Sequence, residues 1–311
     1  MWLTDHPGWH TTENRGLHYR AVTSRTFTIA EIEPGAHRAV LPAGEVATLT
    51  TLAIQDGTPW LDPGNADCCL STLVRSDSEP QELTDALASI RWVAHAAVGD
   101  LWEAVAGAVI RAATEPGRTR PVWQRFCLVH GDPVTRDGLT AWRFPRPQQL
   151  LAFPARAFTT TGAITAMRAL RAAARACIGH AEEWQTYPTA ALREELLSVP
   201  HLSPWTVGIA MAEYTGDYSH HPLDEAMRAT IRHLVPGRNW PDHPEDFQRE
   251  WNQFTGGHQA LWNRWVCAWR LHPTPTSSAP HSSVATPTAA SPAGTPPDPA
   301  ATRSTAGHAR R

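Results

Sequence analysis

Apolar residues recur every three or four positions along much of the chain beyond residue 100, which is the spacing of an amphipathic helix. The segment 101–110 has this pattern, and Pro116-Gly117 would end its helix. A second helix through Val122 and Phe126 is expected to stop near Gly131, because glycine is common just beyond a helix end. Similar patterns predict helices over 166–176, 225–234, 246–251 and 257–269.

The first 92 residues have a different pattern. Segments 18–32 and 40–54 are rich in β-branched residues with partial alternation, which predicts antiparallel strands. The segment 80–98 is predicted to be a helix. We therefore expect a mainly α protein, with a small α+β domain containing an antiparallel sheet at 1–92 and a helical domain at 93–272. Residues 273–311 are dominated by Pro, Ser, Thr and Ala, which predicts a disordered tail.

The most informative stretch is 196–228, where a helix, a tight turn, a second helix and an acidic residue follow one another. The turn, Val199-Pro200-His201-Leu202-Ser203-Pro204, cannot continue a helix, because each proline lacks an N–H and restricts the residue before it. Ser203 is placed to cap a new helix that begins at Pro204. Asp224 lies nineteen residues beyond Trp205, at the start of a further helix.

This arrangement resembles the helix-hairpin-helix (HhH-GPD) DNA glycosylases. In that family the hairpin usually has the form Leu-Pro-Gly-(Val/Ile)-Gly, and the catalytic aspartate follows inside a Val/Leu-Asp pair at a spacing like that of Leu223-Asp224. His201 and Ser203 stand here where the family has glycines. Lyase members carry lysine at the position of Trp205, so the chain is most similar to 3-methyladenine DNA glycosylase II. The resemblance covers residues 93–272 well and residues 1–92 loosely.

The resemblance implies a site for base excision. Asp224 would be the catalytic residue, because the N-glycosidic bond breaks through a cationic sugar that a carboxylate can stabilise. Trp205, Trp262 and Trp265 would form the base pocket, since a tryptophan face attracts an electron-poor alkylated base. The hairpin residues that would meet the DNA backbone are His201, Leu202, Ser203 and Thr206, and the candidate phosphate contacts are Arg111 and Arg228.

Each of these residues also has a purely structural interpretation. Asp224 is well placed to be the N-cap of a helix beginning at Glu225, and capping would fix the direction of its carboxylate without excluding catalysis. Buried tryptophans are more often ordinary core residues than ligand contacts. The hairpin could likewise be a plain turn between two helices.

The chain contains no lysine, since all 27 of its basic residues are arginine. A guanidinium stays protonated and cannot form the Schiff base through which lyase-type glycosylases act. Only the α-amine of Met1 could serve as a covalent amine nucleophile. The composition therefore predicts a monofunctional hydrolase that leaves an abasic site.

Charge and composition limit the compartment, the cofactors and the partners that can be expected. The net charge of −3 is low for a DNA-binding protein, because phosphate contacts need cations, although a local basic patch would suffice. Five cysteines without CxxC spacing favour a reducing cytoplasm, without a zinc or iron–sulfur site. The sequence has neither an apolar run of membrane-spanning length nor a signal-peptide pattern. We expect a cytoplasmic monomer that needs no metal or cofactor and does not associate with membranes.

These observations predict an enzyme that flips and excises a damaged or modified base from double-stranded DNA, with alkylated purines as the default substrate. The altered hairpin, and the lack of a polar base reader in the turn 111–115, indicate a specialised substrate such as a bulky base. Two alternatives stay open. One is an N-glycosidase acting on a free nucleoside or nucleotide, and the other is a catalytically inactive DNA-binding module in which Asp224 only caps a helix.

Overall fold

The computed structural model describes residues 3, 5–11, 17–21, 27–33, 36–43, 46–55, 58–60, 68–72, 80–90, 92–136 and 139–271. The chain divides into two units, Met1–Thr274 and Pro275–Arg311, and all described residues belong to the first. The tail predicted for 273–311 therefore lies outside the described residues. Within those residues, every helix is too short or too polar to cross a bilayer.

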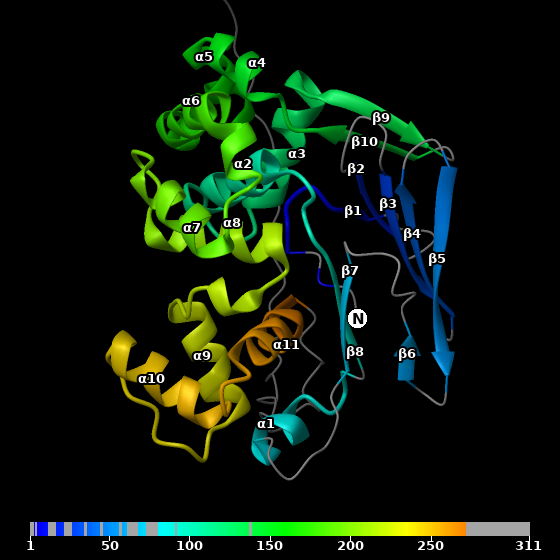
Figure 1. Ribbon diagram of the computed structural model, residues 1–311, viewed down its shortest axis with the longest axis vertical. Coiled ribbons are helices and arrows are strands. Elements are labelled where there is room, and N and C mark those ends of the chain that lie inside the picture. The colour runs from blue at the N-terminus through cyan, green and yellow to red at the C-terminus, as the bar shows by residue number, and fades with distance from the viewer. Residues whose placement is uncertain are drawn as a thin grey trace, which may run out of the picture. The chain divides into compact units, whose positions relative to one another are not determined.

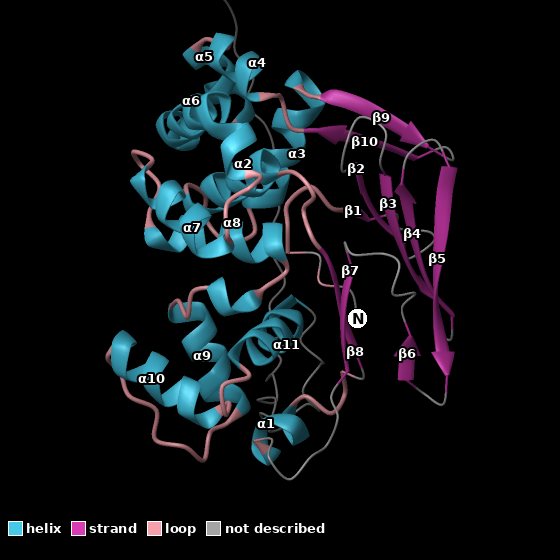
Figure 2. Cartoon of the chain, in the orientation of Figure 1, coloured by secondary structure: helices cyan, strands magenta, loops and turns pink. Residues whose placement is uncertain are grey.

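Helices make up most of the chain beyond residue 100, as the apolar spacing predicts (Figures 1 and 2). The α-helices are α1 (Gln81–Ala86), α2 (Leu101–Ala112), α3 (Thr119–His130), α4 (Pro147–Ala152), α5 (Ala155–Thr161), α6 (Met167–Trp184), α7 (Thr189–Ser198), α8 (Pro204–Thr215), α9 (Glu225–Leu234), α10 (Pro244–Phe254) and α11 (Gln259–Leu271). Two short 3-10 helices, η1 (Ile164–Ala166) and η2 (Tyr218–His220), precede α6 and follow α8.

The strands are antiparallel and lie mostly in the N-terminal third. A six-stranded sheet has the order β1-β2-β3-β4-β5-β6, from β1 (His10–Thr11), β2 (Leu17–Ala21), β3 (Phe27–Glu33), β4 (Ala36–Ala43), β5 (Val46–Gln55) and β6 (Thr58–Trp60). Two further pairs are β7 (Cys68–Thr72) with β8 (Trp92–Ala96), and β9 (Asp132–Arg136) with β10 (Leu139–Arg143). The strands predicted over 18–32 and 40–54 are thus present.

The single helix predicted over 80–98 is wrong. Helix α1 ends at Ala86, and β8 pairs with β7 in a register that places Thr72 opposite Trp92. Tertiary pairing has overridden a weak helical pattern here, because a strand can gain its hydrogen bonds from a partner distant in sequence.

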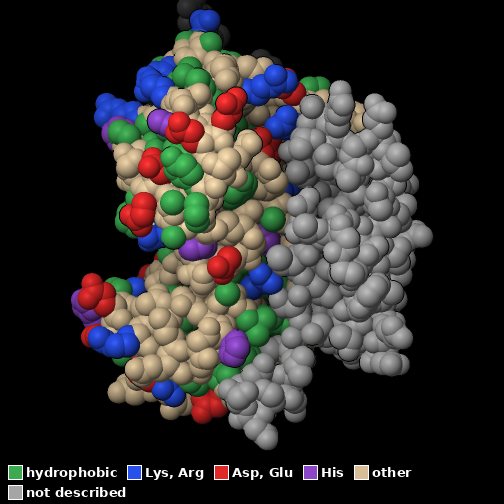
Figure 3. Space-filling model, in the orientation of Figure 1, with side chains coloured by type: hydrophobic (Ala, Val, Ile, Leu, Met, Phe, Trp, Pro, Cys, Tyr) green, Lys and Arg blue, Asp and Glu red, His purple; other side chains and the backbone are tan. Residues whose placement is uncertain are grey.

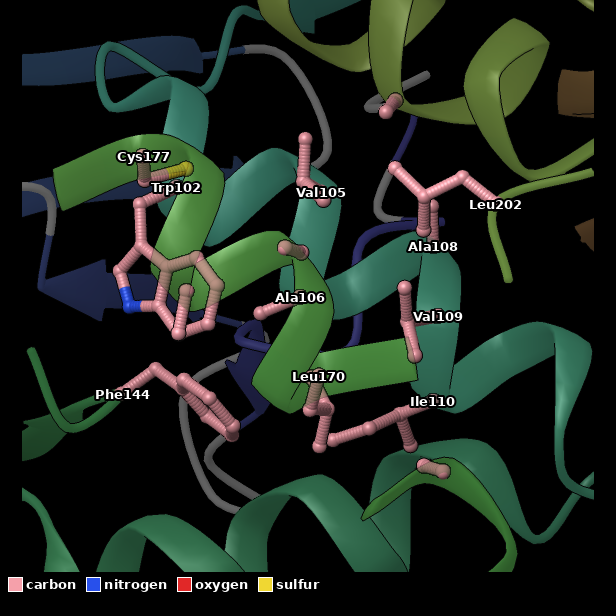
Figure 4. Packing of buried hydrophobic residues seen from close by; sticks show 14 of the residues in the cluster. Trp102, Val105, Ala106, Ala108, Val109, Ile110, Phe144, Leu170, Cys177 and Leu202 are labelled. Atoms are coloured by element: carbon pink, nitrogen blue, oxygen red, sulfur yellow. The ribbon is translucent and has the colours of Figure 1, made fainter. Parts of the chain in front are cut away.

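Two hydrophobic clusters fill the interior. The first gathers residues of α2 to α8, and Figure 4 shows Val109 and Ile110 of α2 with Leu170 and Cys177 of α6. The second joins Leu3 and the segment 83–93 to residues of η2, α9, α10 and α11. It therefore contains side chains from both sides of the domain boundary predicted at residue 92. Burying apolar side chains of this size contributes about 1.5–3 kcal/mol each.

Helix α2 is central to the packing of the helical region. It packs along α8 and also contacts α6 and α3, while α11 packs on η2 and α9 (Figure 1). The N-cap of α2 is Asp100, whose carboxylate accepts a hydrogen bond from the Trp102 N–H at 2.9 Å. The C-terminal turn of α2, the hairpin before α8 and the start of α9 carry most of the predicted site residues.

Candidate active site

The hairpin joins α7 to α8 through residues 199–203. His201 has φ of 70°, which is the left-handed region where a non-glycine residue is strained by about 1 kcal/mol. His201 therefore keeps a backbone conformation that glycine would adopt freely. Ser203 is extended, with φ −83° and ψ 159°, and its Oγ accepts the Thr206 N–H at 3.1 Å. This confirms the predicted N-cap and shows why a glycine is not needed at position 203.

Side-chain contacts hold the loop from α8 to α9 at several points. His221 is buried, and its ring nitrogens lie 3.1 Å from the Pro222 carbonyl oxygen and 3.5 Å from Cys267 Sγ. Burial, reinforced by Arg111, lowers the pKa of His221 to about 4, so this imidazole stays neutral at physiological pH. Arg228 Nη1 donates to the Leu223 carbonyl oxygen at 3.2 Å. The backbone immediately before Asp224 is consequently held in place.

Asp224 is the N-cap of α9, and both oxygens of its carboxylate accept hydrogen bonds. Oδ1 accepts the Met227 N–H at 2.8 Å, and Oδ2 accepts Nε1–H of Trp205 at 3.0 Å. Partial burial alone would raise the pKa of Asp224. The hydrogen bonds from Met227 and Trp205, with the positive charge of Arg270, outweigh that effect and lower the pKa. Asp224 is therefore an oriented carboxylate that remains ionised at neutral pH.

Asp224 and Trp205 line the same pocket, which has a volume of about 320 Å³. The N-terminal segment, the end of α2, the α2–α3 turn and helices α3, α8, α9 and α11 all contribute to its wall. Its charged lining residues are Asp5, Asp224, Arg111, Arg120 and Arg270. The described part of the wall thus combines the aromatic ring of Trp205 with three arginines and two aspartates.

The structure separates the three tryptophans predicted for the base pocket. Trp205 lines the pocket, whereas Trp262 and Trp265 are fully buried in the second hydrophobic cluster and are not among its lining residues. Their spacing along α11 turns both indoles toward the protein interior, where α11 covers α9 and η2. For these two residues, the structural interpretation holds.

The two arginines predicted as phosphate contacts are both engaged within the protein. Arg111 lines the pocket and forms an ion pair with Asp5. Arg228 forms an ion pair with the exposed Glu225 at 2.5 Å, in addition to its bond to the Leu223 carbonyl oxygen. Arg111 therefore belongs to the pocket, and Arg228 supports the start of α9.

Sequence reasoning missed Asp5, Arg120 and Arg270 as pocket residues. Asp5 lies in the N-terminal segment, far in sequence from every motif, and no local pattern points to it. Arg270 lies one residue before the end of α11, where a basic residue is also explained by the helix dipole. Among the described residues, no group of three or more His, Cys, Asp or Glu side chains is arranged to hold a metal ion.

The hairpin borders a second concave surface. Arg168, Arg171 and Arg175 follow one face of α6 and line a groove of about 560 Å³ together with Pro200 and His201. Arg171 is partly engaged, since its Nη2 donates to the Phe153 carbonyl oxygen at 2.7 Å. On the helical part of the face drawn in Figure 3, basic and acidic side chains are interspersed. We call Arg168, Arg171 and Arg175 the basic strip, and it is confined to the groove beside the hairpin.

The hydrogen bond between Trp205 and Asp224 can be tested without any assay of function. We expect Trp205→Phe to raise the pKa of Asp224, because the indole hydrogen bond stabilises the charged carboxylate and phenylalanine has no donor to replace it. The carboxyl carbon of Asp224, followed by NMR as pH is varied, gives this pKa directly. Trp184→Phe is the matched control, because the indole N–H of Trp184 has no hydrogen-bond partner within the described residues. An Asp224 titration unchanged by Trp205→Phe would contradict the role given to this bond.

No protein-family model matches the sequence, and no curated protein matches it at the sequence level. Solved structures do resemble it. MBOgg1 in complex with a low-affinity DNA ligand matches with a TM-score of 0.58 at 15% identity, over 86% of this chain and 90% of that one. The 8-oxoguanine glycosylase/lyase of Clostridium acetobutylicum matches in its apo-form with a TM-score of 0.60 at 14% identity, over 85% and 89%.

The same Clostridium enzyme in complex with double-stranded DNA containing cytosine opposite 8-oxoG matches with a TM-score of 0.62 at 13% identity, over 86% of this chain and 89% of that one. The particular similarity to 3-methyladenine DNA glycosylase II stays a prediction. Because these likenesses cover nearly the whole of each solved structure, they show that this chain has the same fold as those proteins.

Proposed function

We propose that the protein is a monofunctional DNA N-glycosylase, which hydrolyses the bond between a modified base and its deoxyribose. The observation that carries this proposal is the placement of Asp224. Its carboxylate is fixed by two hydrogen bonds, remains ionised, and opens into a pocket with an aromatic wall. A helix cap alone would not require the second hydrogen bond from Trp205 or a hollow beside it.

The chemistry follows from this geometry. A base inside a duplex is out of reach, so the nucleotide must be flipped into the pocket. As the C1′–N bond breaks, its electron pair stays with the base and positive charge develops on the sugar. The Asp224 carboxylate stabilises that charge, and an oxygen of water then bonds to C1′. A proton from this water neutralises the departing base, which leaves an abasic sugar.

Several features support duplex DNA as the partner. The hairpin is exposed at His201 and lies beside the basic strip formed by Arg168, Arg171 and Arg175. Guanidinium groups in such a groove can contact successive phosphates. Two of the solved structures with this fold are DNA complexes, one of them with double-stranded DNA. Under this proposal the hairpin residues Leu202, Ser203 and Thr206 hold the turn in shape, since Leu202 and Thr206 are buried and Ser203 is the N-cap.

The absence of lysine supports hydrolysis without strand cleavage. The Clostridium relative is named as a glycosylase/lyase, whereas the indole of Trp205, at the position where lyase members carry lysine, cannot form a Schiff base. We therefore expect borohydride to trap no abundant covalent adduct between the protein and a duplex containing an abasic site. Denaturing gel electrophoresis measures this, and abundant trapping would contradict a monofunctional enzyme.

The proposed activity is tested by incubating the full chain with labelled duplexes, each carrying one modified base. Strand breaks should appear only after alkali or piperidine treatment, because the enzyme itself leaves the backbone intact. Release of base from free nucleosides but not from duplexes would instead favour the nucleoside-hydrolysing alternative. No release from either kind of substrate would refute the proposed activity.

A further inference from the structure

The Trp205 indole is flanked by two opposite charges. Its Nε1–H donates to Asp224 Oδ2 at 3.0 Å, and the guanidinium carbon of Arg111 lies 5.7 Å from the ring centroid. This distance is that of a cation–π contact. The pocket therefore has a carboxylate at one side of the tryptophan and a guanidinium over its ring.

Arg111 is held firmly in this position. Its Nη1 donates to Asp5 Oδ2, and only 18% of the Arg111 side chain and 15% of the Asp5 side chain are exposed. Burial disfavours the charged guanidinium, but the Asp5 carboxylate and its hydrogen bond more than offset this and raise the pKa of Arg111. The bond to Asp5 uses one of the five guanidinium N–H groups, so others can face a base in the pocket.

We infer that Arg111 determines specificity, and that it selects neutral bases with ring carbonyl groups over cationic alkylated purines. The inference rests on the function proposed above and deepens it by naming the substrate class. It differs from the alkylated-purine default, which comes from the family resemblance. The reason lies in the charge each kind of base carries before and after the bond breaks.

A purine alkylated at N3 or N7 is already cationic in the nucleotide and leaves as a neutral molecule. It would enter a pocket in which the Arg111 guanidinium already lies over the Trp205 ring, and two like charges at that ring repel each other. It would also compete with Arg111 for the tryptophan ring, which packs at the same time against the first hydrophobic cluster. Displacing Arg111 would leave the partly buried Asp5 carboxylate without its ion-pair partner.

A neutral base leaves with the electron pair of the glycosidic bond and becomes anionic. If the base has ring carbonyl groups, part of that charge moves onto oxygen, where guanidinium N–H groups can donate hydrogen bonds. Breaking the bond then creates a cation on the sugar and an anion on the base. Asp224 at the indole N–H and Arg111 over the indole ring carry the opposite pair of charges, so the pocket stabilises both developing charges together.

The test compares single-turnover release from duplexes of one sequence that carry uracil, hypoxanthine, 8-oxoguanine, 3-methyladenine or 7-methylguanine. The wild-type chain should release at least one carbonyl-bearing neutral base about tenfold faster than either methylated purine. Arg111→Gln should slow release of that neutral base by about 100-fold, since losing one transition-state hydrogen-bond donor has an effect of this order. It should leave release of the methylated purines unchanged or faster, so that the preference disappears.

Arg238→Gln is the matched control. Arg238 also pairs with a carboxylate, Glu250, and also lies over a tryptophan, with its guanidinium carbon 5.4 Å from the Trp240 ring centroid, but it is outside the pocket. Its replacement should leave the preference unaltered. The double variant Asp5→Asn with Arg111→Gln removes the same charge without leaving Asp5 unpaired, and should lose the preference as Arg111→Gln does.

Faster release of methylated purines by the wild-type chain would overturn the inference and leave the proposed glycosylase intact. Equal slowing of both base classes by Arg111→Gln would also overturn it, because Arg111 would then support the pocket without selecting the base. Failure to release any of the five bases would overturn the proposed function, and the inference with it.

Discussion

Replacing Asp224 by asparagine should slow base release by at least about 100-fold while leaving the protein folded. The change removes the negative charge that faces the developing cation, and loss of such electrostatic stabilisation has effects of this size. Asparagine is as good an N-cap as aspartate, so the Met227 N–H keeps its acceptor. The amide N–H₂ would then face Nε1–H of Trp205, and losing that hydrogen bond costs about 1 kcal/mol of unfolding free energy.

The measurement is single-turnover base release, paired with urea unfolding to confirm that the variant is folded. Asp217→Asn is the matched control, because Asp217 is exposed, also accepts a backbone N–H, from Ser219 at 2.9 Å, and does not line the pocket. It should retain full activity. If Asp224→Asn kept more than a third of the wild-type rate, Asp224 would be a cap and no more, and the proposed mechanism would have to be given up.

The local chemistry of the hairpin and of the α9 start could be predicted from sequence because it depends on neighbouring residues. A proline that cannot continue a helix and a serine that can cap one act within a few positions, so Ser203 and Asp224 could be placed as caps from the sequence alone. The end of α3 at Gly131 follows from the same short-range rules, and Pro116-Gly117 lies in the turn beyond α2, which ends at Ala112.

The composition of the pocket could not be predicted in the same way. Asp5 and Arg111 are more than a hundred positions apart, and their ion pair exists only because the N-terminal segment packs beside the end of α2. The two tryptophans of α11 show that a suitable residue type does not by itself place a side chain in the pocket. Trp262 and Trp265 had the residue type expected of a base pocket, but which face of a helix is buried depends on what packs against it. β8 was missed for a related reason, because its partner strand is distant in sequence.

Replacing Gly208 by alanine should both destabilise the protein and slow base release. Gly208 lies within α8, and a Cβ there would come within 2.6 Å of the His220 carbonyl oxygen, which is closer than real Cβ contacts allow. The obstacle is backbone, so it cannot rotate away as a side chain would. Either α8 or the loop 216–224 must move, and overpacking of this kind costs about 1–3 kcal/mol of unfolding free energy.

Movement of α8 or of the loop 216–224 would also affect Asp224, although the contact between Gly208 and His220 lies outside the pocket lining. The loop that would move leads directly into Asp224, which accepts the hydrogen bond from Trp205 on α8, so moving this loop away from α8 would lengthen that bond. Because a shift of about 1 Å can cost about 100-fold in rate, we expect release to fall by more than the loss of folded protein explains.

Urea unfolding and single-turnover release at a temperature where Gly208→Ala is still folded separate its two effects. Gly179→Ala is the matched control, since Gly179 also lies within a helix, α6, but a Cβ there would have no heavy atom within 4 Å. Alanine should stabilise that helix by about 0.5–1 kcal/mol and leave release unchanged. A Gly208→Ala protein that was less stable but fully active would show that Asp224 tolerates movement of its loop. The close approach of α8 would then serve folding alone.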